Sequence, residues 1–303
     1  MIEPIGVERN SVVTSLGTMV YYSPTKFPWV SETETLDSDR PTLLFLHGFG
    51  GGSSAYEWSK VYPAFAREYR VLAPDLLGWG RSDHPERQYS PHDYITTILE
   101  FIEKTCSQSP IVVASSLTAG LTIRAAIEKP DRFQSLILCA PTGLSDFGED
   151  YRSNFFAQIA SIPVLDRLIY SMGIANMTGI MNFLETRQFA QANRIYSEIG
   201  EAYLESASKP NAEYAALSFV RGDLCFDLAR YLPQLTVPTA IFWGKESQLT
   251  GPELGKRLAA LNPDQIKTFI ELEDVGLTPQ LELPAVTIAI LQQCLISFQN
   301  MAR

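Results

Sequence analysis

The chain has 303 residues, 46% of them hydrophobic, which is enough to bury the core of one large α/β domain with an insertion or of two medium domains. Its formal net charge of -10 provides no basic surface, so we expect no nucleic-acid partner. No uninterrupted apolar run approaches the ~18 residues of a membrane-spanning helix, so we expect no membrane span.

Short apolar segments rich in β-branched residues alternate with longer amphipathic segments along most of the chain. This alternation is typical of a mostly parallel sheet with helices on both faces. The expected strands are 11–14 and 19–22, which form an opening hairpin, followed by 42–46, 70–73, 111–114, 136–139, 240–243 and 268–272. The expected helices are 56–67, 92–104, 117–129, 252–260 and 284–298. Residues 25–40 are polar and flanked by prolines, which predicts a surface loop.

The alternation breaks once, between about residues 145 and 229, where strand-like runs give way to helical periodicity, as in Phe155-Phe156-Ile159. We therefore expect an α/β core domain of residues 1–144 and 230–303, with a helical cap of residues 145–229 inserted after the sixth strand. Such a cap would lie over the carboxyl ends of the sheet, where open α/β folds bind ligands. Most of its apolar residues are expected to pack onto the core. Flexible methionines beside aromatic residues would also suit a bulky apolar guest.

Two loops with glycines follow expected strands at one edge of the sheet. The first, HGFGGG at residues 47–52, lacks the GxGxxG spacing and the Gly-Lys-Ser/Thr of nucleotide-binding loops. It favours a turn whose backbone N–H groups point at a developing oxyanion, with Phe49 as the best donor. In the second loop, Asp75 and Arg81 are expected to order the backbone through hydrogen bonds.

The third segment is a strand that runs through Ser115 and Ser116 into an expected helix. This arrangement is similar to a nucleophile elbow, in which a serine lies on a strained strand-to-helix turn between small residues. Ser116 is the candidate nucleophile, and Ala114 and Thr118 occupy the usual glycine positions. We expect the β-branched Thr118 to crowd the oxyanion pocket or to alter the approach of the helix.

Together these segments resemble the α/β-hydrolase superfamily, and the resemblance covers almost the whole chain. HGFGGGSSAYEW, RVLAPDLLGWGRSD, the elbow, FWGKES and GLTPQLELP occur in the family's order and at its usual spacing. The resemblance implies an eight-stranded, mostly parallel sheet, a helical cap and a Ser-acid-His triad. It also implies oxyanion-hole amides at Phe49 and Leu117. The sequence is further similar to a branch from photosynthetic organisms, some of whose members act on isoprenoid esters such as chlorophyll.

Two triad positions depart from the family pattern. The acid position, three residues after Gly244, holds Ser247, and the histidine position holds Leu277. A serine hydroxyl is a poor nucleophile until a positioned base removes its proton, and a leucine cannot do so. In subtilisin, loss of the triad serine or histidine lowers the rate on the order of 10⁶-fold. We therefore expect negligible turnover by the usual mechanism.

A base could be restored only by rearrangement. His84 and His92 lie in a segment that starts at the correct edge of the sheet, although a surface or loop-ordering role is more common for such histidines. His47 is expected to hydrogen-bond its own turn. Lys245, beside Glu246, is expected to be a solvated ion.

The sequence also bears on the orienting acid and on metal or cofactor binding. Asp146 lies where some family members place the acid. No HExxH, carboxylate cluster or dinucleotide fingerprint occurs, so we expect no metal and no cofactor. The cysteines lack CxxC spacing and are expected to be free buried thiols in a reducing compartment. The first residues carry acidic groups and no apolar leader, so we expect a cytoplasmic protein.

Three functions remain open, in order of preference. The first is a non-catalytic or very weakly active protein that binds a small or medium apolar molecule, or an ester-like ligand, between cap and core. The second is a serine hydrolase of the carboxylic ester class with a rearranged base. The third is an interaction protein that presents its cap surface to a protein partner. The candidate pocket residues are Ser115, Thr118, Asp146, Met172, Met177, Met181 and Phe183.

Overall fold

The computed structural model describes residues 3–31, 40–149, 151–153, 155–162 and 165–301. The middle of the expected loop 25–40, residues 32–39, lies outside the described residues, as do the side chains of Phe155 and Phe156. Among the described helices, none combines the length and the hydropathy that crossing a bilayer requires.

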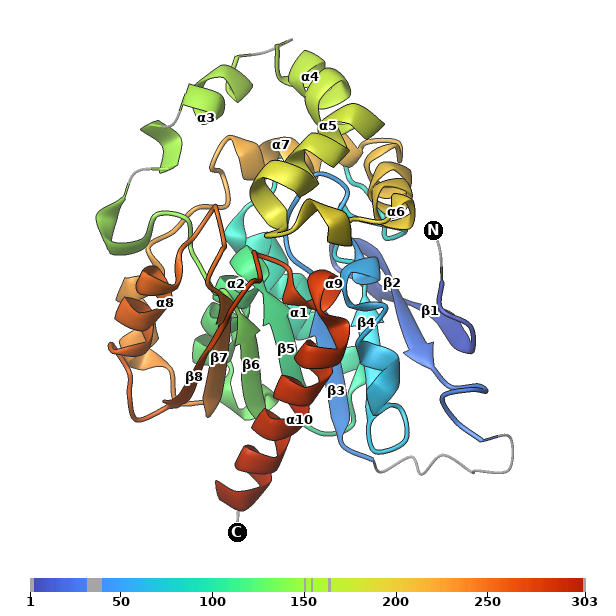
Figure 1. Ribbon diagram of the computed structural model, residues 1–303, viewed down its shortest axis with the longest axis vertical. Helices are drawn as coiled ribbons and strands as arrows, with labels where there is room; N and C mark the ends of the chain where they lie inside the picture. The colour runs from blue at the N-terminus through green and yellow to red at the C-terminus, as the bar shows by residue number, and fades with distance from the viewer. Residues whose placement is uncertain (1–2, 32–39, 150, 154, 163–164, 302–303) are drawn as a thin grey trace.

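Eight strands form one sheet in the order β1-β2-β4-β3-β5-β6-β7-β8, which confirms the expected fold class (Figure 1). β1 pairs with β2, and β2 with β4, in antiparallel orientation. The remaining neighbours, from β4 through β3 to β8, pair in parallel orientation. β3, β5, β6 and β7 are buried at every position, which is why they are continuous apolar runs. The strands are β1 (Val7–Thr14), β2 (Gly17–Pro24), β3 (Thr42–Leu46), β4 (Arg70–Pro74), β5 (Ile111–Ser115), β6 (Ser135–Cys139), β7 (Thr239–Gly244) and β8 (Ile266–Leu272).

Helices cover both faces of this sheet. In Figure 1, α10 lies in front of the strands and α1 and α2 lie behind them. Four of the five expected helices are confirmed within a few residues, and the short α9 precedes the last of them. The helices of the core are α1 (Pro91–Thr105), α2 (Ser116–Glu128), α8 (Pro252–Ala259), α9 (Pro279–Glu282) and α10 (Pro284–Met301), with 3₁₀ turns η3 (Pro130–Arg132), η9 (Leu228–Arg230) and η10 (Leu232–Gln234).

The expected helix 56–67 is wrong. Two separate 3₁₀ turns occupy this segment, η1 (Ala55–Trp58) and η2 (Tyr62–Phe65). Pro63 explains the break, because proline has no N–H to donate and its ring clashes with the carbonyl of the preceding turn. The consequence for the site is that Glu57 lies on a short, fully buried turn rather than on a long amphipathic helix.

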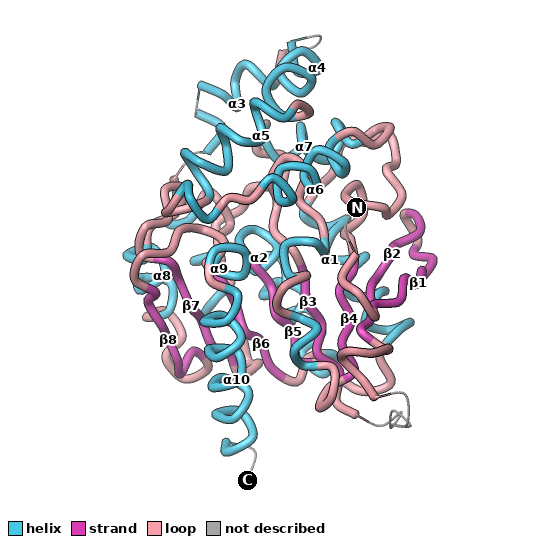
Figure 2. Tube along the Cα trace, turned by 45° about the vertical axis from the view of Figure 1, so that its right-hand side comes forward, coloured by secondary structure: helices cyan, strands magenta, loops and turns pink. Residues whose placement is uncertain are grey.

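Between β6 and β7 the chain forms a helical insertion, which lies over the end of the sheet (Figures 1 and 2). Its described elements are η4 (Asp146–Gly148), η5 (Tyr151–Ser153), α3 (Phe155–Ala160), α4 (Leu165–Ile169), η6 (Tyr170–Ile174), α5 (Met177–Phe183), η7 (Leu184–Gln188), η8 (Ala192–Arg194), α6 (Ser197–Ala207) and α7 (Ala212–Val220). A second cluster of buried apolar side chains, which includes Leu184, Ile199 and Tyr203, packs within this insertion and against Tyr56 of the core.

The two ends of the insertion are tied together. The Asp146 carboxylate accepts hydrogen bonds from the Thr142 hydroxyl at 2.7 Å and from the Leu228 backbone N–H at 2.9 Å. The Phe226 N–H donates to the Gly143 carbonyl at 2.8 Å, and a parallel bridge joins Leu144 to Phe226. The insertion therefore leaves and re-enters the core at one place.

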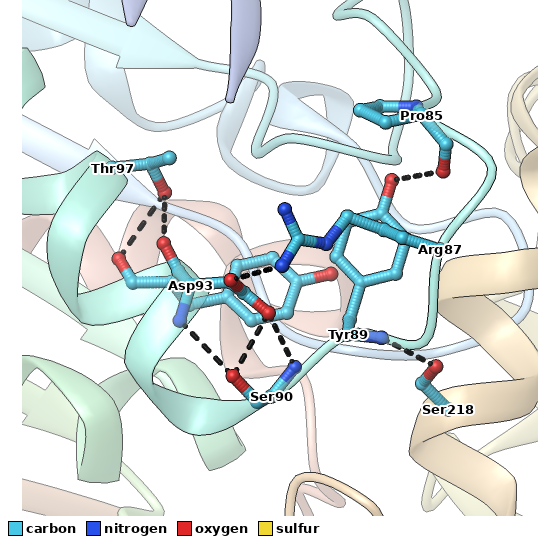
Figure 3. A network of polar contacts seen from close by, with 8 residues as sticks. Pro85, Arg87, Tyr89, Ser90, Asp93, Thr97 and Ser218 are labelled. Atoms are coloured by element: carbon cyan, nitrogen blue, oxygen red, sulfur yellow. Dashed lines mark hydrogen bonds and ion pairs between the residues drawn. The ribbon is translucent and has the colours of Figure 1, made fainter. Parts of the chain in front are cut away.

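The segment before α1 links the core to the insertion (Figure 3). The Tyr89 N–H donates to the Ser218 hydroxyl of α7 at 3.0 Å. Ser90 and Asp93 form a capping box at the start of α1, and Arg87 pairs with Asp93 at 2.7 Å. The cap satisfies backbone N–H groups that the first helical turn would otherwise leave without acceptors.

Replacing Ser90 with alanine should lower the free energy of unfolding by about 1 kcal/mol, because the capping hydroxyl is lost. Urea denaturation measures this change. The matched control is Ser208→Ala, at an exposed serine beyond α6, for which we expect a change within about 0.5 kcal/mol. Equal effects of the two substitutions would contradict the capping role.

Candidate functional site

A small cavity lies where the ends of β3, β5 and β8 meet the helical insertion. Its volume is about 10 Å³, which is room for a single water-sized group. Most of its lining side chains are polar. The lining residues are Gly48, Phe49, Ser53, Glu57, Ser115, Ser116, Phe183, Gln188, Leu277 and Thr278. This cavity has no room for the bulky apolar guest expected between cap and core, and Phe183 of the insertion packs against the glycine-rich loop near Gly50.

Ser116 lies on a strained turn at the end of β5. Its backbone is left-handed (φ 56°), which is costly for a residue with a side chain and is the geometry of a strand-to-helix elbow. Ser116 is also the first residue of α2, so the N–H of Leu117 lies in the first turn, where no helical acceptor exists. Within the described residues, no group hydrogen-bonds the Ser116 hydroxyl.

Leu277 lines the same cavity as Ser116. It follows β8, is 7% exposed, and its backbone N–H donates to the Gln188 carbonyl of the insertion at 2.8 Å. An apolar side chain therefore occupies the position that the resemblance gives to the catalytic histidine. Ser247, at the acid position, is half-buried in the loop after β7 and is not part of the lining.

None of the three histidines lines the cavity. His47 is fully buried, with Nδ1 2.7 Å from the Gly48 carbonyl and Nε2 accepting the Leu76 N–H at 2.9 Å. These contacts fix the neutral Nδ1–H tautomer, and burial lowers the pKa of His47 to about 4. His84 is half-buried with a pKa lowered by burial, and His92 is exposed at the start of α1.

Lys245 and Asp146, the other candidates for a rearranged base or acid, are not part of the cavity lining. Lys245 is exposed and pairs with Glu273. Both oxygens of Asp146 are engaged at the stem of the insertion, where burial raises the pKa of its carboxyl. Among the described residues no group of three His, Cys, Asp or Glu side chains could hold a metal ion. The cysteines are free thiols, with Cys139 and Cys294 buried and the remaining pair, Cys106 and Cys225, only half-buried.

Two of the expected pocket residues, Ser115 and Phe183, line the cavity. The other five lie outside the lining. Thr118 is fully buried inside α2, and Asp146 lies at the stem of the insertion. Met172 is 70% exposed, and the sulfur atoms of Met177 and Met181 lie against Gly200 of α6. Met177 and Met181 therefore pack within the insertion, and Met172 faces solvent.

Phe49, the expected oxyanion-hole donor, does line the cavity. Its side chain is buried and packs edge-on against Trp79 and Tyr94, with ring centroids 5.3 and 4.8 Å away. It also stacks on Phe219 of the insertion. These contacts hold the loop after β3 close to the Ser116 turn.

Sequence reasoning missed Glu57, which is 2% exposed and lines the cavity. Its Oε2 accepts the Gly48 N–H at 2.9 Å, and its Oε1 accepts the Tyr203 hydroxyl at 3.1 Å. Burial raises the pKa of the Glu57 carboxyl, and hydrogen bonds from Ser53, Gly48 and Tyr203 oppose that rise. The sequence feature that could have indicated this residue is an acidic side chain inside the apolar run Ala55–Trp58, shortly after the glycine-rich loop.

Gln188 joins Glu57 to the insertion. Its Nε2 donates to the Tyr203 hydroxyl at 2.9 Å, and that hydroxyl donates in turn to Glu57. Its backbone carbonyl accepts the Leu277 N–H. A continuous set of contacts therefore runs around the cavity, from the core through the insertion and back to the core.

We expect the His47 ring to stay neutral in the folded protein down to about pH 4, which histidine NMR would measure. Its pKa in the folded chain lies below the ordinary value of 6.5, so the unfolded chain takes up the proton first as the pH falls. The contribution of this group to stability is complete above pH 6.5 and is lost toward pH 4. A His47 ring that titrated near pH 6.5 would contradict its burial.

The chain is similar to known proteins along most of its length. A sequence model described as the alpha/beta hydrolase family matches residues 43–290. A 2-(acetamidomethylene)succinate hydrolase from Mesorhizobium japonicum is 25% identical over 255 residues, which is 82% of this chain and 87% of that relative. An uncharacterized Mycobacterium tuberculosis protein is 31% identical over 124 residues, 41% of this chain, and the match spans only about a third, 34%, of that relative's length.

Solved structures share the fold. An epoxide hydrolase superposes with a TM-score of 0.77 at 19% identity and covers 98% of this chain and 100% of its own. A thermophilic esterase from Thermogutta terrifontis has a TM-score of 0.74 at 19% identity, over 96% of this chain and 99% of its own. At these identities the likeness concerns the fold alone.

Proposed function

Because the chain belongs to the alpha/beta hydrolase family, we propose that it is a non-catalytic or very weakly active member that binds a small ligand at the Ser116 cavity. The observation that carries this proposal is the side chain at residue 277. Leu277 lines the cavity beside Ser116, and the described lining contains no imidazole and no amine. Without such a group the Ser116 hydroxyl keeps its proton and is a poor nucleophile.

The Glu57 carboxylate supports the same proposal. It is the titratable side chain in the lining, and both of its oxygens already accept hydrogen bonds. It also lies against the backbone of the oxyanion loop, since Gly48 donates to it one residue before Phe49. A negative charge at this place opposes the negative charge that develops on a carbonyl oxygen during attack.

We assign the cap role to residues 145–229, with residues 1–144 and 230–303 as the core domain. Phe183 lines the cavity from the insertion, so a ligand larger than a water-sized group would have to displace it. Leu168 and Met172 of the insertion have exposed apolar side chains. A protein partner at this surface therefore stays a prediction. The cytoplasmic location expected from the sequence stays a prediction as well.

A second candidate function, a carboxylic ester hydrolase with a rearranged base, is favoured by one observation. Glu57 shares the cavity with Ser116, and burial raises the pKa of its carboxyl above the ordinary value. A base works best when its pKa lies near the working pH. We rank this function below the first, because both Glu57 oxygens already accept hydrogen bonds.

Restoring the triad tests the first proposal. We expect the parent protein to hydrolyse p-nitrophenyl butyrate no faster than background and to resist labelling by a fluorophosphonate probe. The double variant Leu277→His with Ser247→Asp should raise hydrolysis by about 10²-fold or more, because a base and its orienting acid return. Adding Ser116→Ala to that variant is the control and should abolish the gain. A parent that is as active as the restored variant would sink the proposal.

The second candidate makes a different prediction for Glu57→Gln. If Glu57 is the base, this substitution removes all ester hydrolysis that depends on Ser116, while Glu198→Gln leaves it unchanged. Glu198 is the matched control, because it also accepts a tyrosine hydroxyl, that of Tyr56 at 2.8 Å, but is not part of the cavity lining. We expect neither variant to change the background rate of the parent.

A further inference from the structure

Glu57 is a fully buried carboxylate whose hydrogen-bond partners are all neutral. They are the Gly48 N–H, the Ser53 hydroxyl and the Tyr203 hydroxyl. In the described part of the chain no lysine, arginine or histidine side chain pairs with it. Buried carboxylates in proteins are normally paired with a positive charge, since desolvation is otherwise uncompensated. Among the described residues, no positive side chain therefore compensates a charged Glu57 in the Ser116 cavity.

The amide of Gln188 presents an acceptor to this cavity. The hydroxyl proton of Tyr203 is used on Glu57, so the Tyr203 oxygen can only accept from Gln188, and Gln188 must place its Nε2 there. Its Oε1 is then left over, and within the described residues this buried atom has no partner. The side chain is 4% exposed and lines the cavity.

Two further buried oxygens of the lining have no partner among the described residues, Ser115 Oγ and Thr278 Oγ1. These residues are 2% and 4% exposed. Ser115 Oγ and Glu57 Oε2 converge, because they lie 3.3 and 3.5 Å from the point that a Cβ on Gly48 would occupy. Glycine at residue 48 therefore keeps open a space bounded by a carboxylate and a hydroxyl.

The size of the cavity selects among head groups. About 10 Å³ admits one water-sized atom with its hydrogens. An ammonium group has that size and donates three hydrogen bonds, which matches a site rich in free acceptors. A carboxylate or phosphate is larger and would be repelled by Glu57, and a hydroxyl fits but leaves the buried charge unpaired.

We propose that the Ser116 cavity binds the primary ammonium group of a small organic amine, with Glu57 as its counter-ion and Ser115, Gln188 and Thr278 as hydrogen-bond acceptors. This inference rests on the proposed function, because it takes the Ser116 cavity as the ligand site and adds the chemistry of the head group. The rest of the amine leaves the cavity past Phe183. The Cε1 atom of Phe183 lies 3.6 Å from the point that a Cβ on Gly50 would occupy.

The test compares three probes of equal chain length, n-butylammonium, n-butanol and n-butyrate, titrated into the full-length protein at pH 7.5 by calorimetry. We expect n-butylammonium to bind about 10-fold or more tightly than n-butanol, and n-butyrate not to bind, because only the cation pairs with the buried carboxylate. Equal binding of the amine and the alcohol, tighter binding of butyrate, or no binding of any probe would overturn the inference.

Two pairs of variants locate the binding. Glu57→Gln should weaken n-butylammonium binding about 10-fold or more, while Glu198→Gln, outside the lining, should leave it unchanged. Phe183→Ala should tighten binding of the amine, because the alkyl chain no longer displaces a packed ring. If Glu57→Gln does not fold, Ser115→Ala replaces it, and circular dichroism checks each variant. Unchanged amine binding in folded Glu57→Gln or Ser115→Ala would exclude this site.

The failure of this inference is distinguishable from failure of the proposed function. Ester turnover by the parent would overturn the non-catalytic role, whatever head group the cavity prefers. A parent that neither turns over esters nor prefers the amine would overturn the ammonium site alone.

Discussion

The buried carboxylate of Glu57 joins the core to the helical insertion. Its oxygens hold the Gly48 backbone on one side and the Tyr203 hydroxyl of α6 on the other. Tyr203 in turn positions Gln188, and the Gln188 carbonyl holds the loop that carries Leu277. One acidic side chain that is removed from water therefore links the glycine-rich loop, α6 and the loop that carries Leu277.

The Ser116 cavity holds a buried carboxylate beside the backbone of the glycine-rich loop. The strained turn at Ser116 and the loop at Phe49 both line this cavity. Leu277 lies in the described lining of the cavity, and no imidazole does. A carboxylate beside the oxyanion loop favours positive or hydrogen-bond-donating guests over anionic ones. These two features are the physical basis of the ligand-binding role that we propose.

Titratable residues elsewhere in the core are used to build loops. Asp75 is fully buried and accepts hydrogen bonds from the N–H groups of Ala55 and Arg81 and from the Tyr22 hydroxyl, while burial raises its pKa to about 6. His47 holds the neighbouring turn through Leu76. These groups have the chemistry of catalytic residues, but their hydrogen-bonding atoms are occupied by backbone and tyrosine. Their role is to set the shape of the sheet edge on which the cavity lies.

The sequence by itself determined the sheet, its flanking helices and the elbow, because these depend on local periodicity and on motifs read within a few residues. The substitutions at Ser247 and Leu277 were visible for the same reason. Pro63 was also a local signal, and it outweighed the amphipathic pattern that predicted a helix around it. Only the tertiary structure decided the role of Glu57, whose burial depends on Tyr203, a residue 146 positions away. It also decided the size of the cavity, since the volume beside Ser116 is set by how Phe183 packs on the glycine-rich loop, and such packing leaves no periodic trace in the chain.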